Sequence, residues 1–443
     1  MDQSEVKFDI AKSITLKLKE AGQTAYFAGG CVRDFLMKRL PTDYDIATTA
    51  KPDLIEKLFE KTVPVGKQFG VILVIVDKIP FEVATFRSEG AYHDGRHPSE
   101  VQFTSPEEDA KRRDFTINGL FFDPFSENVI DYVKGQVDIQ KKVIRTIGNA
   151  HDRFREDKLR LLRAVRFATN LQFQIEAETW TAIKEMAHEI RSVSAERIRE
   201  ELVKLFTRDR AGDGLELLSK SGLLNEILPE IEAMKGVEQP PDFHPEGDVF
   251  VHTKIMMNKL QNPTMALAFG ALLHDVGKPS TYSNEEGKIR FYSHSRIGAK
   301  MAEGILRRLR FSNKEIDQII ACVDNHMTFA NVKKMRVGKL KQFIMRPGFL
   351  DELELHKIDC ESSHGMLDNY QFLKEKLVEY AKEDLKPKPL INGDDLIALG
   401  ISPGPTIKKI LEEIYVMQLE GKIESKDKGL QWVKQKYPPP KIT

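Results

Sequence analysis

One stretch decides the fold of this 443-residue chain: residues 29–48, GGCVRDFLMKRLPTDYDIAT. A glycine pair, which permits a tight backbone turn, precedes a helix-like run that ends at Leu40, and Asp43 and Asp45 follow at the start of an apolar segment. In a strand, side chains at positions i and i+2 point to the same face, so two carboxylates at this spacing can converge on a pair of divalent cations. The stretch therefore predicts the outline of a phosphoryl-transfer site.

Length and composition limit what the chain can be. A single core rarely serves more than ~250–300 residues, so two to four domains are expected. Lys plus Arg and Asp plus Glu each number 67, so contacts with nucleic acid must come from local basic patches. The three cysteines lie far apart in sequence and indicate neither a disulfide framework nor a zinc site. No apolar N-terminal region or ~18-residue apolar stretch occurs, which predicts a cytoplasmic protein without membrane association.

The pattern of apolar residues divides the chain into four predicted parts. Residues 1–148 mix helix-like runs with β-rich stretches at 70–76 and 81–86, which predicts an α+β fold. Residues 149–235 repeat apolar residues at three- and four-residue spacing and are expected to form helices only. Residues 238–241 interrupt this periodicity and predict a linker. Residues 242–380 are patterned as helices and contain seven of the eleven histidines, and residues 385–443 form a predicted helical tail.

The first group of predicted site residues surrounds the glycine pair. Gly30 would permit close backbone approach of a triphosphate, and Arg33, in the first turn of the following helix, would offer it positive charge. A third carboxylate is usually needed beside a metal pair, and Glu82, in a strand-like run with apolar neighbours, is the candidate. The alternative for Glu82 is an acid on a solvated strand face.

The second group lies in residues 153–166, which are patterned as a helix. On a helix, Asp157 and Arg160 would be neighbours at positions i and i+3, where they could bind the edge of a base or form an ordinary ion pair. Residue physics alone favours the ion pair. Each three-residue step slips about 60° around a helix, so Arg163 would flank the pair and Arg166 would point further away. A charged run at residues 107–118 alone is typical of solvated surface.

Together, residues 26–235 resemble the class II tRNA nucleotidyltransferases, which are the CCA-adding enzymes, and their poly(A) polymerase relatives in the polymerase-β-like nucleotidyltransferase superfamily. Three motifs stand in family order: Gly29-Gly30-x-x-Arg33-Asp34 with Asp43-x-Asp45, then Arg112-Arg113-Asp114, then Glu156-Asp157-x-x-Arg160. The resemblance implies a nucleotidyltransferase head with an antiparallel or mixed sheet, followed by all-α domains.

The resemblance also implies a reaction and residue roles. A pair of Mg²⁺ ions would support in-line attack of an RNA 3′-hydroxyl on the α-phosphate of CTP or ATP, without an RNA template. The implied metal ligands are Asp43 and Asp45, and the implied nucleotide contacts are Gly30, Arg33, Arg113, Asp114, Asp157, Arg160, Arg163 and Arg166.

Two segments bear on the product. Residues 87–98 match the flexible loop that family members need to add the terminal A, which speaks against an enzyme that adds only the two C residues. Residues 65–70 lack the basic run typical of bacterial poly(A) polymerases. The leading expectation is therefore addition or repair of CCA at the tRNA 3′ end, with an A-adding enzyme or a poly(A) polymerase as alternatives.

The histidine-rich region predicts a second metal centre. His252, His274-Asp275 and Asp359 follow the order His…His-Asp…Asp, and mixed nitrogen and oxygen ligands suit a divalent metal. With Lys278, the pattern resembles the HD phosphohydrolase superfamily. This resemblance implies four ligands, His252, His274, Asp275 and Asp359, and a second metal site completed by His294 and His326. Mg²⁺, Mn²⁺, Ni²⁺ and Fe²⁺ are the candidate metals. The competing interpretation is a chiefly hydrolytic HD protein whose N-terminal domain only binds nucleotide.

The predicted tail resembles the tail of the same nucleotidyltransferases. Lys408 and Lys409 follow a Pro-Gly-Pro turn that opens a helix, where they could contact RNA phosphates. An equal alternative is a helical cap whose lysines are simply solvated. The sequence does not reveal the oligomeric state.

Overall fold

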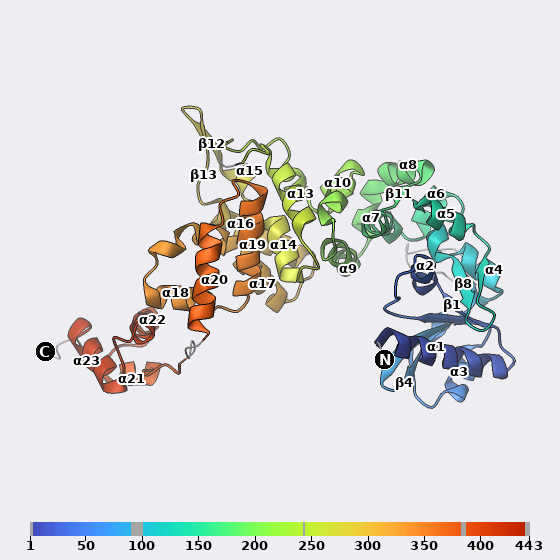
Figure 1. Ribbon diagram of the computed structural model, residues 1–443, viewed down its shortest axis with the longest axis horizontal. Coiled ribbons are helices and arrows are strands. Elements are labelled where there is room, and N and C mark those ends of the chain that lie inside the picture. The colour runs from blue at the N-terminus through green and yellow to red at the C-terminus, as the bar shows by residue number, and fades with distance from the viewer. Residues whose placement is uncertain (1–2, 90–100, 242–243, 382–386, 439–443) are drawn as a thin grey trace. The chain divides into compact units, whose positions relative to one another are not determined.

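The computed structural model describes residues 3–89, 101–241, 244–381 and 387–438 and divides into two compact units, residues 1–232 and 233–443 (Figure 1). The first unit contains a mixed sheet and helices, and the second is mainly helical, which confirms the predicted α+β class. Within the described residues, no helix is long and apolar enough to span a membrane.

A seven-stranded mixed sheet organises the first unit. Its strand order is β3-β4-β5-β2-β1-β8-β9, with β1 antiparallel to β2 and β2 parallel to β5. The strands are β1 (Ala25–Ala28), β2 (Asp45–Thr48), β3 (Thr62–Gly66), β4 (Val71–Val76), β5 (Ile79–Thr85), β8 (Leu120–Asp123) and β9 (Asn128–Asp131).

The two faces of this sheet differ because side chains alternate along each strand. Phe27 and Ile46 face a large core beneath α1 (Gln3–Glu20) and α3 (Pro52–Leu58) (Figure 1). Ala28 and Ala47 face the opposite side, where a smaller cluster includes Phe121. Small side chains on this second face leave room for polar groups, and strand alternation places Asp45 on the same face as Ala47.

The sheet is followed by short elements and then by helices. The short elements are β6 (Arg87–Glu89), β7 (Val101–Phe103), α4 (Pro106–Lys111), a 3-10 turn (Thr116–Asn118), α5 (Gly135–Lys141) and β10 (Val143–Ile144). The helices are α2 (Gly30–Leu36), which precedes β2, and α6 (Ala150–Glu156), α7 (Leu159–Leu171), α8 (Ala177–Met186), α9 (Ala195–Phe206), α10 (Ala211–Lys220), α11 (Leu223–Ile227) and α12 (Pro229–Glu232).

The helical part of this unit also contains a strand, and part of a predicted loop lies outside the described residues. Residues 149–235 are not purely helical, because β11 (Gln174–Ile175) pairs in parallel with β10. Most of the loop expected at residues 87–98 lies outside the described residues, from residue 90 onward.

The second unit is built around α14 (Met265–Leu273), which is buried from Ala266 to Leu273. It packs against α13 (Val249–Lys259), α17 (Asn313–Asn325) and α19 (Phe349–Ser362). The hairpin β12 (Tyr282–Glu285) with β13 (Lys288–Phe291) was not predicted in this helical region. The remaining elements are α15 (Lys278–Thr281), α16 (His294–Arg308), a 3-10 segment (His326–Lys334), α18 (Val337–Ile344), α20 (Asp368–Tyr380), α21 (Gly393–Ala398), α22 (Pro405–Leu419) and α23 (Lys426–Lys436).

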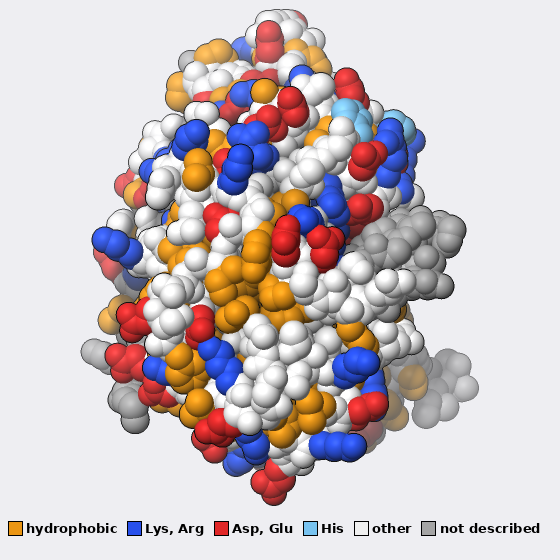
Figure 2. Space-filling model, turned by 90° about the vertical axis from the view of Figure 1, so that its right-hand side faces the viewer, with side chains coloured by type: hydrophobic (Ala, Val, Ile, Leu, Met, Phe, Trp, Pro, Cys, Tyr) orange, Lys and Arg blue, Asp and Glu red, His pale blue; other side chains and the backbone are white. Residues whose placement is uncertain are grey.

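The surface charges agree with the zero net charge of the chain. On the face that Figure 2 shows, Lys and Arg side chains are interspersed with Asp and Glu side chains around an apolar area. Any attraction of nucleic acid would therefore depend on local groups of basic residues.

Candidate active sites

Asp45 and Glu82 lie side by side on the second face of the head sheet. Asp45 opens β2, and the parallel pairing of Ile46 with Val83 places Glu82 next to it on β5. Burial among protein atoms, with the charges of Glu82 and Asp43, raises the pKa of Asp45 to about 6 against the lowering effect of Arg113. Asp45 nevertheless remains exposed to solvent, so a cation can reach its carboxylate.

Asp43 lies before the strand, so the expectation that one strand carries both acids is wrong. Tyr44 is buried between the two exposed aspartates, which preserves the alternation that directs both acids to the same side. Asp43 forms an ion pair with Lys7 of α1 at 3.1 Å. In the described chain, Asp43, Asp45 and Glu82 do not bring three ligand atoms within 4.8 Å of one another.

Three arginines from two helices gather around one buried ring. The guanidinium carbons of Arg33, Arg163 and Arg166 lie 5.3, 5.3 and 4.0 Å from the centre of the Phe167 ring. Arg33 is also held by Asn118, whose Oδ1 accepts a 2.7 Å hydrogen bond from Nη1. The guanidinium groups of Arg163 and Arg166 thus both turn back onto the Phe167 ring.

Arg113 lies directly over the glycine turn. Its guanidinium donates to Asp109 at 3.0 and 3.1 Å and lies 5.1 Å from the centre of the Phe121 ring. Gly29 has φ +70°, and a Cβ there would lie 2.9 Å from Arg113 Nη1. The positive φ at residue 29 favours glycine, and the absence of a Cβ lets Arg113 approach without shifting.

Asp114 is fully engaged within the protein. Its Oδ2 accepts hydrogen bonds from Arg163 at 2.6 and 2.9 Å, and its Oδ1 accepts from Asn118 and from the Phe115 amide. Burial alone would raise the pKa of Asp114, but Arg163 outweighs it and lowers the pKa to about 2. Asp114 therefore links Arg163 of α7 to the head.

Asp157 and Arg160 do not share one helix, contrary to the expectation from their spacing. Asp157 has an extended conformation between α6 and α7, where its Oδ1 accepts from the Leu159 amide at 3.1 Å. Arg160 instead donates to Glu156 at 2.6 Å and to the carbonyl oxygen of Arg153 at 3.0 Å. An aspartate competes well for free backbone amides at a helix start, and this breaks the helix at Asp157.

Helix α9 supplies two partners that sequence reasoning missed. Arg197 donates to Asp157 Oδ2 at 2.7 Å, and Glu201, one turn later, pairs with Arg166. A signal existed, because Glu201 interrupts an apolar stripe formed by Ile198, Leu202 and Leu205. A buried acid on such a stripe indicates a cationic partner.

The histidines of the second unit form one buried row. Successive ring centres are 5.5 Å apart for His252 and His274, 5.4 Å for His274 and His326, and 5.1 Å for His326 and His294. Asp359 approaches His252 Nε2 at 3.1 Å. The structure thus brings the predicted histidines together with Asp359.

Asp275 lies at the centre of the row. Its Oδ1 is 3.5 Å from His294 Nε2, and its Oδ2 is 3.1 Å from His274 Nε2 and 2.7 Å from Lys278 Nζ. Nearby positive groups hold the pKa of Asp275 well below its usual range despite the opposing effect of burial. Asp275 is shared by two of the three residue groups able to hold a metal ion: His252 with His274, and His294 with His326.

Three of these histidines direct Nε2 inward by the same means. The Nδ1 atoms of His274, His294 and His326 face backbone carbonyl oxygens three residues earlier, at 2.9, 2.9 and 2.6 Å. When Nδ1 donates to a carbonyl, a neutral imidazole presents a lone pair at Nε2. The Nε2 atoms of His294 and His326 are 3.1 Å apart, so a shared cation would relieve the repulsion between two lone pairs.

Gln239 of the predicted linker, and Glu246 just beyond it, also reach this centre. Gln239 accepts a hydrogen bond from Lys278, and Glu246 lies 2.9 Å from His244 and 2.6 Å from His252. His244, Glu246 and His252 form a third group able to hold a metal ion. Sequence reasoning missed Gln239, His244 and Glu246, because the prolines and the glycine among them are typical of an irregular connection.

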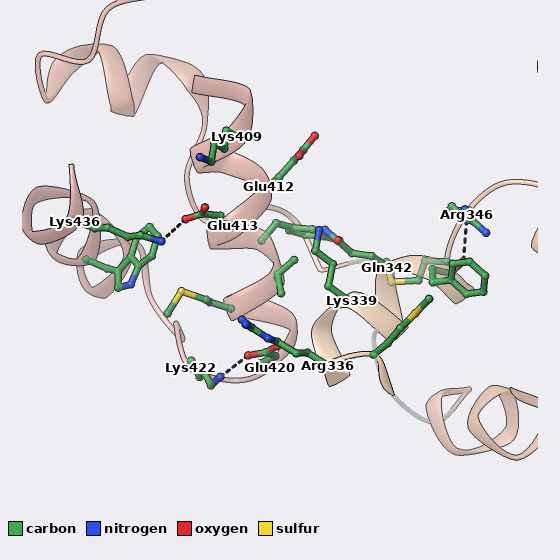
Figure 3. Close-up of a pocket in the computed structure, with 17 residues that line it drawn as sticks. Arg336, Lys339, Gln342, Arg346, Lys409, Glu412, Glu413, Glu420, Lys422 and Lys436 are labelled. Atoms are coloured by element: carbon green, nitrogen blue, oxygen red, sulfur yellow. Dashed lines mark hydrogen bonds and ion pairs between the residues drawn. The ribbon is translucent and has the colours of Figure 1, made fainter. Parts of the chain in front are cut away.

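The tail contributes a basic groove of about 1380 Å³ between α18 and α22 (Figure 3). Lys409 lies in this groove with Lys339, and neither has a carboxylate within ion-pair distance among the described residues. Lys408 is exposed on the same helix but does not line the groove. Gly338 permits α18 to pass close to α22, because a Cβ at this residue would collide with the Val416 carbonyl oxygen.

Three family models match the chain. They are the poly A polymerase head domain at residues 25–145, the probable RNA and SrmB-binding site of polymerase A at residues 172–235, and the putative tRNA nucleotidyltransferase domain 2 at residues 283–433. None of these three models describes a phosphohydrolase.

Curated relatives and solved structures match over nearly the whole chain. The CCA-adding enzyme of Bacillus cytotoxicus is 33% identical and that of Bacillus subtilis 35% identical, with 97% and 94% of this chain and 98% and 95% of the relatives covered. The Bacillus stearothermophilus CCA-adding enzyme in complex with CTP superposes with a TM-score of 0.75 at 26% identity, covering 98% of both chains. The Thermotoga maritima CCA-adding enzyme complexed with tRNA has a TM-score of 0.56 at 18% identity, covering 98% of this chain and 96% of that one, which shows the shared fold alone.

Proposed function

The chain belongs to the CCA-adding enzymes, and from this membership we propose that it adds or repairs the CCA end of tRNA from CTP and ATP without an RNA template. The observation that carries the proposal is the convergence of all three motif groups in one unit of a chain that aligns with 98% of a CCA-adding relative. The cytoplasmic localisation expected from the sequence stays a prediction.

The acids of the head would hold a divalent metal, which we propose to be Mg²⁺. Such an ion, bound at Asp45 with Asp43 and Glu82, would neutralise charge on the triphosphate and lower the pKa of the attacking hydroxyl. The raised pKa of Asp45 fits this role, because a carboxylate crowded by other acids is stabilised by a cation.

The arginines around Phe167 would hold the triphosphate. Arg33 and Arg166 are largely buried and kept in place by neighbouring acids, so little conformational entropy is lost when phosphate binds. Arg113 extends the positive charge toward Asp45.

Base recognition belongs to the junction between α6 and α7. Asp157 accepts from Arg197, and Arg160 is fixed by Glu156, so both polar groups are preorganised. A base whose edge matches this donor and acceptor set binds well, and a mismatched base leaves buried polar groups unpaired. To bind, the base would have to replace Arg197 and Glu156 as hydrogen-bond partners of Asp157 and Arg160. Only a base that offers hydrogen bonds as good as these would be selected.

The test offers purified protein tRNA lacking CCA, tRNA ending in C, tRNA ending in CC, and oligo(A), with CTP and ATP separately. A CCA-adding enzyme extends the three tRNAs and leaves oligo(A) unchanged. Extension of tRNA ending in CC alone would instead identify an A-adding enzyme, and extension of oligo(A) a poly(A) polymerase. Asp45→Asn should abolish incorporation, whereas Asp77→Asn, in an exposed turn of the same sheet, should not.

The histidine row favours a second function, hydrolysis of phosphate esters, which we propose as a side activity. Four buried atoms of the row lack a well-directed hydrogen bond within the described protein: Glu246 Oε2, His252 Nδ1, His274 Nε2 and Asp275 Oδ2. Two of them have a charged group close by, since Lys278 Nζ lies 2.7 Å from Asp275 Oδ2 and Glu246 Oε1 lies 2.6 Å from His252 Nδ1. Buried polar atoms with poorly directed hydrogen bonds are costly, and a bound divalent metal would satisfy the inward-facing ones. The residues therefore fit a metal, which when bound would activate a water molecule as the nucleophile. Lys278 would stabilise phosphate charge.

The phosphohydrolase proposal is tested with p-nitrophenyl phosphate and bis(p-nitrophenyl) phosphate, each with Mg²⁺, Mn²⁺, Ni²⁺ or Fe²⁺. Hydrolysis should vanish in the double variant His274→Ala, Asp275→Ala, while CTP incorporation into tRNA persists. His364→Ala, an exposed histidine of the same unit, is the matched control. Hydrolysis that survives the double variant would refute this assignment.

A further inference from the structure

His252 differs from the other histidines of the row in what faces its outer nitrogen. His274, His294 and His326 each direct Nδ1 to a backbone carbonyl three residues earlier. For His252 that carbonyl belongs to Val249, and it already accepts a 2.9 Å hydrogen bond from the Thr253 hydroxyl. Nδ1 of His252 instead lies 2.6 Å from Glu246 Oε1.

A nitrogen and an oxygen this close need a proton between them. The His252 side chain is fully buried, the Glu246 side chain is 6% exposed, and no other group of the described protein bonds His252 Nδ1. The short separation places a proton on Nδ1. Nε2 lies 3.1 Å from Asp359 Oδ1, so without a metal it also carries a proton, which it shares with that carboxylate, and a metal that binds at Nε2 would displace this proton.

Glu246 is itself held in place from several sides. His244 Nδ1 contacts the same oxygen, Oε1, at 2.9 Å. The Gln239 amide donates to the Gly247 carbonyl at 2.8 Å, and the Val249 amide donates to the Val237 carbonyl at 3.1 Å, so the backbone on both sides of Glu246 is tied together. The carboxylate is therefore preorganised before any metal arrives.

We propose that Glu246 is a positioning residue of the histidine centre, which orients His252 and strengthens Nε2 as a metal ligand. This inference rests on the proposed phosphohydrolase function. A carboxylate that accepts from the outer nitrogen of a ligating histidine fixes the tautomer and ring orientation and increases the basicity of the inner nitrogen. Glu246 thereby replaces, with a full negative charge, the carbonyl that serves the other three histidines.

The test measures Mn²⁺ affinity of the full chain by titration calorimetry, with the head acids replaced (Asp43→Asn, Asp45→Asn) so that only the second centre is observed. Glu246→Ala should weaken Mn²⁺ binding by about 10- to 100-fold. Glu246→Gln has the same shape and can still accept the proton but lacks the charge, so its affinity should be intermediate. Glu238→Gln, an exposed acid of the same segment, should bind as the parent does.

The possible results distinguish the role of Glu246 from the proposed metal centre on which it rests. If the parent binds no Mn²⁺, or if His252→Ala binds it equally well, the metal centre itself is refuted and the inference with it. If His252→Ala abolishes binding while Glu246→Ala leaves it unchanged, the centre stands and the role of Glu246 is overturned. Affinity of Glu246→Gln equal to that of the parent would show that side-chain shape suffices and would also overturn the role.

Discussion

Asp45 and Asp114 are two aspartates of the head whose pKa values move in opposite directions. Asp114 is buried against Arg163, which lowers its pKa to about 2, whereas crowding and the charges of Glu82 and Asp43 raise the pKa of Asp45 to about 6. Asp114 already has its cation within the protein. Asp45 gains most from a cation that arrives with the substrate.

This difference predicts a pH-dependent effect of Asp45→Asn on stability. The ordinary pKa of the group is 3.8, and it is raised in the folded state, so the folded protein binds this proton more tightly than the unfolded chain. Ionisation therefore destabilises the fold as pH rises from about 4 through about 6. In metal-free buffer, Asp45→Asn should raise the thermal midpoint at pH 8 and change it little at pH 4, as measured by circular dichroism.

The comparison variant is Asp77→Asn, whose exposed side chain should give no such pH dependence. Addition of Mg²⁺ at pH 8 should stabilise the parent more than Asp45→Asn, because only the parent keeps the carboxylate. A parent that is at least as stable as Asp45→Asn at pH 8 without metal would contradict the assignment.

At the residue scale, the sequence predicted regular geometry better than contacts between distant residues. The pairing of β2 with β5, which spacing does not report, brings Glu82 beside Asp45. Spacing did direct Asp43 and Asp45 to the same side, because strand alternation is a regular geometry. It failed at Asp157, because helical periodicity continues through residues where the backbone is in fact extended. Side-chain hydrogen bonding to free amides is a local competition that periodicity does not report.

Helix α9 acts at the element scale, because one face of it supports two functional residues of its neighbours. Arg197 holds Asp157, and Glu201, four residues later, holds Arg166 and approaches Arg163 at 3.7 Å. Residues four apart lie on one face of a helix. Correct placement of this single helix thus aligns the nucleotide contacts of α7 and of the junction before it.

Loss of Glu201 should therefore be costly. Glu201→Ala leaves Arg166 as a largely unpaired buried charge and should lower the free energy of unfolding by about 3 kcal/mol in urea titration. Glu200→Ala, on the exposed side of the same helix, should stay within about 0.5 kcal/mol of the parent. Equal effects of the two variants would show that the buried pair does not support the helix.

The elements themselves were predictable to different degrees. The β-rich stretches at 70–76 and 81–86 correspond to β4 and β5, since alternating burial gives strands a clear signature. The β12–β13 hairpin was missed, although Glu286 and Gly287 at its turn both have positive φ values. A glutamate in that conformation is uncommon, so the turn carried no strong sequence signal.

At the scale of the whole molecule, separate units carry the two proposed chemistries. Every contact described for nucleotide addition lies within residues 1–232, and every member of the histidine row lies within residues 233–443. The basic groove between α18 and α22 belongs to the second unit as well. We therefore expect substitutions in the groove to alter any affinity for tRNA that it provides without changing the nucleotide site.

Salt dependence tests whether the tail lysines contact RNA. Lys409→Ala removes a groove charge and should weaken tRNA binding, with the slope of log Kd against log salt reduced by about 1. Lys408→Ala, adjacent on α22 but outside the groove, should change the slope less. Filter binding at several salt concentrations measures both, and a larger effect of Lys408→Ala would reject the groove as the RNA contact.

The backbone hydrogen bonds around Glu246 restrict where the chain can be cut to express the second unit alone. Gln239 pairs with Gly247, and Val237 pairs with Val249 at the start of α13. The segment before α13 is therefore hydrogen-bonded to the start of this helix. A fragment that starts at α13 would keep the histidines yet discard Glu246. Excision for separate expression should therefore begin upstream of residue 236, and a shorter product could be mistaken for an intrinsically inert domain.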